Sequence, residues 1–182
     1  YYLVNNFSYA LKQQGLKKGD RVIIYMPTIP EAIIAMLSCA RLGLIHSVVF
    51  AGFSSESLQN RINDCQAKIV ITVDGFERNG KIIKAKETVD QALSMGCPSI
   101  KNSIVFKNLK NKIEFNKNID IYWDEILSSK QQIVKPEIMS SEDLLFILYT
   151  SGSTGKPKGI MHTTAGYLLN SIITNKWVFD LK

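Results

Sequence analysis

The sequence contains few cysteines, and none is placed for disulfide or zinc chemistry. Its 182 residues include only Cys39, Cys65 and Cys97, with no C-x-x-C pair, and two histidines. This set excludes a disulfide scaffold and argues against a structural zinc site, so we expect no metal ligands. A sparse, odd number of cysteines favours a reducing, cytoplasmic compartment, in which the three side chains are buried and inert.

The sequence also lacks a stretch suited to crossing a membrane. Its longest apolar segment, residues 32–53, contains Arg41 and His46. An arginine near the centre of a bilayer costs about 2.5 to 3.5 kcal/mol on insertion scales, so we expect no membrane partner. The composition, 46% hydrophobic and 21% charged, excludes a disordered chain and predicts one sizeable core.

Arginine is scarce, although the formal net charge is +6. Residues 101–118 hold five lysines and one acid, and these lysines alternate mostly with asparagine. Nucleic-acid binding calls instead for basic residues interleaved with aromatics, or for arginines placed for phosphate and base contacts. The pattern therefore predicts a solvated, variable excursion over residues 101–135 and no nucleic-acid partner.

Helical and strand-like patterns alternate along the chain. A helix with apolar residues at Leu3, Phe7 and Leu11 ends at Gly15. Strands are predicted over 21–26, 46–50 and 68–74, and the helices that follow them over 31–42, 54–67 (capped by Ser54 or Ser55) and 82–93. Three successive βα units predict an α/β fold with a mostly parallel sheet and flanking helices.

The rest of the chain is less regular. We expect a strand or hairpin within 102–118, a short helix near 122–128 and, from the apolar run over 144–149, a strand buried on both faces. Thr163, Thr164 and Gly166 are typical of a helix start, and Trp123 and Trp177 of core or interface residues. The chain opens on Tyr1 inside a helical pattern, so we expect a piece of a longer protein.

Residues 149–159, YTSGSTGKPKG, are built to hold phosphate. Glycines allow backbone N–H groups to converge on an anion, hydroxyls add donors and lysines add charge. The predicted phosphate contacts are Thr150, Ser151, Gly152, Ser153, Thr154, Gly155, Lys156 and Lys158. A flexible surface linker is the alternative, but linkers do not ordinarily follow an apolar strand with so many donors.

The spacing matches neither of two common nucleotide motifs. A Walker A loop requires GxxxxGK[ST], whereas Thr150 stands five residues before Gly155 and Pro157 follows Lys156. GxGxxG is also absent from this segment. Because Pro157 disfavours helix at the residue before it, the lysines are predicted on an extended segment.

YTSGSTGKPKG resembles the signature loop of the adenylate-forming superfamily. The resemblance implies that this chain is an incomplete part of the AMP-binding N-terminal domain. It also implies that the loop embraces the β and γ phosphates of ATP, with Mg²⁺ as activating ion, while a carboxylate attacks the α phosphate. The resemblance also implies that the family's C-terminal domain and its catalytic lysine lie outside these 182 residues. The catalytic residues are therefore unknown. We expect residues 1–182 to be inactive without the remainder of the protein.

Longer stretches, including HSVVFAGFS and HTTAGYL, resemble acetyl-CoA synthetases, which implies acetate, ATP and CoA as substrates. Propionyl- and acetoacetyl-CoA synthetases remain alternatives, as does a non-catalytic nucleotide- or CoA-binding module. In the family a basic turn contacts the phosphates of CoA, and Arg78, Asn79, Gly80 and Lys81 occupy that place. Gly52 resembles the glycine at which the backbone of the family's members approaches CoA closely. The basic turn and Gly52 are also compatible with ordinary turns that bind no ligand. His162, which follows the loop, is compatible with a structural role.

Overall fold

The computed structural model describes residues 1–128, 132–151 and 157–181. The helices of this part are α1 (Tyr2–Gln13), α2 (Pro30–Arg41), α3 (Ser55–Cys65), α4 (Ala85–Ser94), α5 (Trp123–Ile126) and α6 (Thr164–Trp177). The strands are β1 (Arg21–Tyr25), β2 (Ile45–Val48), β3 (Ile69–Val73), β4 (Phe76–Arg78), β5 (Lys81–Ile83), β6 (Asn102–Phe106), β7 (Asp120–Tyr122), β8 (Leu144–Thr150) and β9 (Lys158–Thr163).

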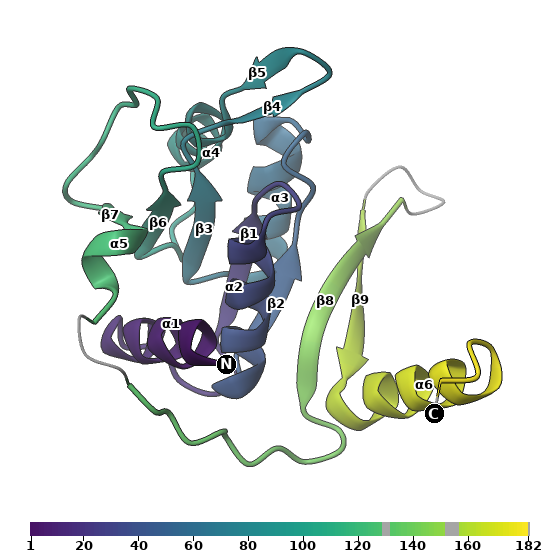
Figure 1. Ribbon diagram of the computed structural model, residues 1–182. Coiled ribbons are helices and arrows are strands. Elements are labelled where there is room, and N and C mark those ends of the chain that lie inside the picture. Colours follow the sequence, from purple (N-terminus) through teal and green to yellow (C-terminus); the bar gives the residue numbers. More distant parts are fainter. Residues whose placement is uncertain (129–131, 152–156, 182) are drawn as a thin grey trace.

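Seven of the strands in the described residues form one sheet, in the order β7-β6-β3-β1-β2-β8-β9 (Figure 1). Neighbouring strands are parallel from β7 to β8, and β9 runs antiparallel to β8. The remaining two, β4 and β5, form a separate antiparallel hairpin. The predicted α/β fold with a mostly parallel sheet is confirmed.

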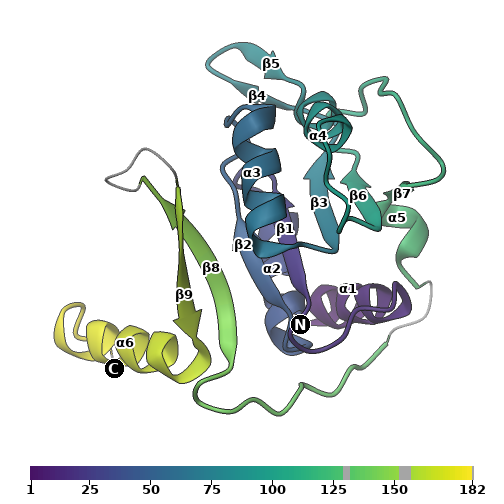
Figure 2. The same cartoon turned by 180° about the vertical axis from the view of Figure 1, so that it is seen from behind.

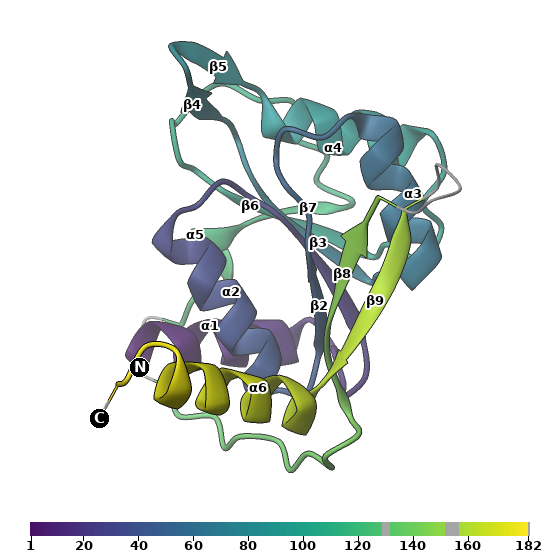
Figure 3. The ribbon, with the colours of Figure 1, turned by 90° about the vertical axis from the view of Figure 1, so that its right-hand side faces the viewer.

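Helices cover both faces of the parallel part of the sheet. Helices α1 and α2 lie on the face seen in Figure 1 and α3 and α4 on the face seen in Figure 2, and the side view in Figure 3 separates the two layers. Central strand β1 is buried from Val22 to Tyr25, as expected for a parallel strand covered on both sides. Phe7 of α1 stacks on Trp123 with ring centroids 3.6 Å apart, which confirms Trp123 as a core residue.

The predicted helix cap at Ser54, the buried cysteines and the predicted helix start at Thr163 are all present in the structure. The side chain of Ser54 accepts a hydrogen bond from the backbone N–H of Ser57 at 3.2 Å and caps α3. The three cysteines are free and buried, and burial raises the pKa of the Cys39 thiol to about 12. Thr163 caps α6, whereas Trp177 near its end is exposed. None of the described helices has the length and apolar character needed to cross a membrane.

The predicted helix over 82–93 was wrong at its start. Residues 76–83 form the β4–β5 hairpin, so α4 begins only at Ala85. Asn79 and Gly80 connect the two strands with φ angles of 52° and 71°. An Asn-Gly pair between short strands favours this type of two-residue turn, and the turn prevails over the helical spacing of the following residues.

The prediction that residues 144–149 are buried on both faces was also wrong. Phe146 and Ile147 are buried, but Leu148 is 42% exposed. Strand β8 pairs with β2 through His46 and Phe146, and on its other side with β9. One face of β8 borders an open apolar pocket, described below, rather than a covering helix.

The lysine-rich region begins as strand β6, parallel to β3, and continues as irregular chain up to β7. Buried Asp74, just after β3, holds this irregular segment. Its carboxylate accepts backbone N–H bonds from Asn108 (2.9 Å), Leu109 (3.1 Å) and Asn111 (2.9 Å). The excursion is therefore tied to the sheet at the base of the β4–β5 hairpin.

Candidate ATP and CoA site

The described site candidates follow the carboxyl ends of parallel strands. Gly52 follows β2, the hairpin that carries Arg78 follows β3, and Thr150 ends β8. These strand ends share one edge of the sheet, at the top of Figure 1. Ligands of open α/β sheets bind at this edge, because loops from separate strands converge there.

The candidate phosphate loop connects β8 to β9. Thr150 and Lys158 face each other across these strands, and both are exposed, as is Ser151. Lys158 thus lies on an extended segment, as predicted from Pro157. The predicted phosphate contacts Gly152, Ser153, Thr154, Gly155 and Lys156 lie outside the described residues.

The stem of this loop is anchored to α3 by Tyr149. Its hydroxyl donates a hydrogen bond of 2.6 Å to Oδ2 of Asp64, and burial together with this bond raises the pKa of Tyr149. The ring packs over Gly159 of β9, where a Cβ would lie 3.1 Å from Tyr149 Cε1 and from Ile147 Cγ2. A side chain at position 159 would therefore have to displace the Tyr149 ring or Ile147 by a few tenths of an ångström. The sequence analysis missed the pair of Tyr149 and Asp64, because the two residues are far apart along the chain.

The candidate CoA turn is the tip of the β4–β5 hairpin. Arg78 and Lys81 are opposite each other on β4 and β5, and residues 78–81 are all exposed. Asn79 adopts the left-handed conformation that asparagine tolerates better than most residues, so glycine is not required at this position. Two cations thus stand side by side on a tight turn, an arrangement suited to binding phosphate.

Gly52 and Arg78, predicted separately, are neighbours in the structure. A Cβ at Gly52 would lie 3.0 Å from Arg78 Nη1 and 2.5 Å from Phe50 Cε1. The Arg78 guanidinium lies 4.7 Å from the centroid of the Phe50 ring. Phe50 is 48% exposed and makes an edge-to-face contact with Phe53. The sequence analysis missed these aromatics, although two phenylalanines flanking a glycine turn are a usable signal for a ligand surface.

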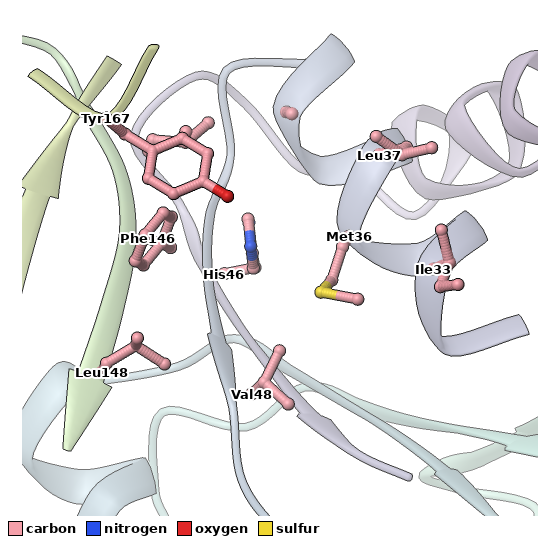
Figure 4. A pocket seen from close by; sticks show the side chains of 10 residues that line it. Ile33, Met36, Leu37, His46, Val48, Phe146, Leu148 and Tyr167 are labelled. Carbon is pink, nitrogen blue, oxygen red and sulfur yellow. The ribbon is translucent and has the colours of Figure 1, made fainter. Parts of the chain in front are cut away.

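An apolar pocket opens between α2, β2, β8 and α6, with a cavity volume of about 310 Å³. Figure 4 shows Phe146 and Tyr167 on one side and Met36 of α2 on the other. Burial lowers the pKa of His46 in this pocket to about 4, and among the described residues its Nδ1 has no hydrogen-bond partner. His162 stacks on Phe146 at 4.5 Å, which gives it a packing role. The pocket is lined by Ile33, Met36, Leu37, Ala40, His46, Val48, Leu145, Phe146, Leu148 and Tyr167.

The described residues contain no group of three or more His, Cys, Asp or Glu side chains that could hold a metal ion. The fit to Mg²⁺ is therefore poor within this part of the chain.

Comparison with known proteins agrees with the resemblance seen in the sequence. A sequence model of the family described as "AMP-binding enzyme" matches residues 1–181. The chain belongs to this family. It is 54% identical over 179 residues to "Acetyl-coenzyme A synthetase" of Pasteurella multocida, covering 98% of this chain and 27% of that protein. Over 178 residues it is 51% identical to "Acetyl-coenzyme A synthetase" of Emericella nidulans, covering 98% of this chain and 26% of that protein.

The fold of this chain is also found in a solved structure. "Acetoacetyl-CoA Synthetase from Streptomyces lividans" superimposes with a TM-score of 0.90 at 26% sequence identity. The match covers 99% of this chain and 27% of that chain. The resemblance to acyl-CoA synthetases is thereby confirmed, and the chain spans 27% of the length of the relative from P. multocida.

Proposed function

We propose that the full-length protein carrying this chain is an acetate–CoA ligase that forms AMP. Acetate reacts with ATP to give acetyl-AMP and pyrophosphate, and the acetyl group is then transferred to the thiol of CoA. The single observation that carries this proposal is the 54% identity, over 98% of the chain, to a protein named acetyl-coenzyme A synthetase. The position of the candidate loop and of the candidate turn, each after the carboxyl end of a parallel strand, supports it.

In the first half-reaction, the loop after β8 binds the phosphates of ATP. Thr150 and Ser151 contribute hydroxyl donors, and Lys158 contributes positive charge from across the hairpin. The sequence pattern predicts that Gly152 and Gly155 let backbone N–H groups converge on the phosphates, and that Ser153, Thr154 and Lys156 add the remaining donors. Donors held in place before the reaction stabilise the charge that grows on departing pyrophosphate.

In the second half-reaction, the β4–β5 turn binds the phosphates of CoA. Arg78 and Lys81 provide the charge, Asn79 and Gly80 form the turn, and Gly52 leaves room beside Arg78. Exposed Phe50 offers an apolar surface next to these cations. A cluster of cationic and aromatic groups suits a ligand that has both phosphates and a flat base.

The rest of the long chain completes the enzyme. The described part of α6 contains no buried residue, and Leu168, Leu169 and Ile172 are exposed along it. We assign the covering of this face and of the apolar pocket to later segments of the same chain, because the relative from P. multocida is almost four times as long as the matched region. Mg²⁺ and the catalytic lysine belong to those segments, and residues 1–182 alone are expected to be inactive.

A longer acid is the second candidate substrate, because the solved relative is named an acetoacetyl-CoA synthetase. The test is exchange of labelled pyrophosphate into ATP by the full-length protein, with acetate, propionate or acetoacetate as the acid. We expect exchange with acetate. Exchange only with propionate or acetoacetate would assign the protein to that acid. No exchange with any acid, together with retained CoA binding, would identify a non-catalytic module.

A further inference from the structure

Arg61 of α3 is a cation that the fold buries. The residue is 6% exposed, and burial lowers the pKa of its guanidinium. Its Nη1 donates to the backbone carbonyl of Ser57 at 2.7 Å and to the Ser57 hydroxyl. Within residues 1–128, 132–151 and 157–181, no carboxylate forms an ion pair with it. A buried charge that is not paired is unfavourable for stability, so its presence needs an explanation.

The two rings beside Arg61 come from the two separate parts of the candidate site. The guanidinium carbon lies 4.7 Å from the centroid of Phe53, which follows Gly52 in the segment after β2 that lies beside Arg78 of the candidate CoA turn. It lies 5.4 Å from the centroid of Tyr149, at the stem of the candidate phosphate loop. A cation over aromatic faces is attracted by their negative charge density, and the attraction is stronger when the group is desolvated.

Phe53 and Tyr149 each have a second contact with the body of the protein. Buried Tyr25 of β1 donates a hydrogen bond of 2.7 Å to the backbone carbonyl of Phe53. Asp64, one turn after Arg61 on α3, accepts the hydrogen bond from Tyr149. One short segment of α3 therefore contacts both parts of the site.

We propose that Arg61 is a positioning residue that holds the stem of the phosphate loop in a fixed relation to residues 50–53, the segment that lies beside the CoA turn. This inference rests on the proposed function, since it assigns the two parts to ATP and CoA. Arg61 touches neither ligand in this proposal. It acts through Tyr149 on the first half-reaction and through Phe53 on the second.

The kinetic test uses the full-length protein and measures the two half-reactions separately. Arg61→Met, which removes the charge and retains much of the side-chain volume, is expected to slow both acetate-dependent pyrophosphate exchange and thioester formation from supplied acetyl-AMP, each roughly tenfold. Arg61→Lys, which keeps the charge, should lie between Arg61→Met and the wild type. Tyr149→Leu should slow only exchange, and Phe53→Leu only thioester formation.

Arg21→Met is the matched control. Arg21 also binds α3, through bonds to the carbonyls of Cys65 (2.7 Å) and Gln66 (3.1 Å), which lie at the C-terminal end of the helix, about one turn beyond Arg61. We expect this variant to lower the melting temperature while both half-reactions of the remaining folded protein stay near wild-type rates. An equal effect of Arg61→Met and Arg21→Met on the rates would overturn the proposal, as would an effect of Arg61→Met on one half-reaction alone.

Hydrogen exchange measured without ligands separates this inference from the proposed function. Arg61→Met should raise exchange in residues 144–150 and in residues 50–53 together, whereas Arg21→Met should raise it near residues 65–67. If wild-type protein shows no pyrophosphate exchange but Arg61→Met still loosens both segments, the proposed function fails and the positioning role stands. If only one segment or neither loosens, the positioning role is overturned.

Discussion

The parallel body, residues 1–128, and the arm, formed by β8, β9 and α6, differ in how much of their apolar surface is covered. The body has helices on both faces of its sheet, and residues such as Phe7, Ile23 and Leu58 are fully buried. In the arm, Leu169 is 59% exposed, and no described residue of α6 is buried. A sheet gains stability from burying both faces, so the body is built as a stable unit and the arm depends on further packing.

This difference separates the two parts of the proposed site. The CoA turn rests on the body, where Tyr25 holds Phe53 and Asp74 holds the neighbouring excursion. The phosphate loop belongs to the arm, whose contacts with the body include the bond from Tyr149 to Asp64 and the ion pair of Lys18 with Asp143 (2.7 Å). Substitutions should therefore act differently in the two regions.

The largest effect is expected in the core of the body. Phe7→Ala should lower the free energy of unfolding of the full-length protein by about 3 to 5 kcal/mol, because it removes a fully buried ring stacked on Trp123. Urea unfolding followed by tryptophan fluorescence measures the change.

Leu169→Ala is the corresponding change in the arm. If later segments cover α6, it should lower the free energy of unfolding by about 2 kcal/mol. If Leu169→Ala leaves the free energy of unfolding of the full-length protein almost unchanged, later segments do not cover α6 and our proposal is contradicted.

At the phosphate loop we expect an effect on catalysis that is confined to one half-reaction. Gly152→Val and Lys156→Ala should raise the barrier to adenylation by about 2.7 to 4 kcal/mol, since they displace or remove groups that bind the departing pyrophosphate. Thioester formation from supplied acetyl-AMP should stay within a few-fold of wild type. Equal losses in both half-reactions would identify the loop as a structural or hinge element.

Acid should destabilise the protein through His46, at the boundary of body and arm. Its pKa of about 4 lies below the ordinary value of 6.5, so between these values the unfolded chain binds a proton that the native chain does not. The free energy of unfolding therefore falls as the pH falls through this window, by about 2 kcal/mol at about pH 5.

Urea unfolding of His46→Gln at about pH 7.5 and about pH 5 checks this assignment, since glutamine removes the titrating group. The difference between wild type and variant in pH dependence should equal the contribution of His46. An unchanged pH dependence would show that His46 is protonated as readily in the native protein as in the unfolded chain.

The smallest effect is expected at the exposed CoA turn. Arg78→Ala and Lys81→Ala should each weaken CoA binding by about 1 kcal/mol, because contacts of exposed charges are screened by water and salt. Steady-state kinetics should give a higher KM for CoA with unchanged pyrophosphate exchange. A matching loss in exchange would mean that the turn acts on ATP instead.

Sequence patterns were sufficient where a structure depends on neighbouring residues. Ser54 caps α3 as predicted, and the alternation of β-rich and helical segments correctly indicated the parallel sheet. Prediction was less successful where two local signals competed. The turn at Asn79 and Gly80 pairs Ile82 and Ile83 with β4, so these residues form a strand and not the first turn of the helix. The exposure of Leu148 could not be predicted, because an apolar run does not say what covers it.

By itself, the sequence determined the fold class, the family and the chemical character of the loop and the basic turn. Periodicity and short motifs depend on residues close together in the chain, and both can be identified without coordinates. Only the tertiary structure brought Gly52 beside Arg78, bound Tyr149 to Asp64 and placed Arg61 between Phe53 and Tyr149. These contacts join residues that are distant in the chain, and their geometry is set by the order of the strands and by the packing of α3 on the sheet.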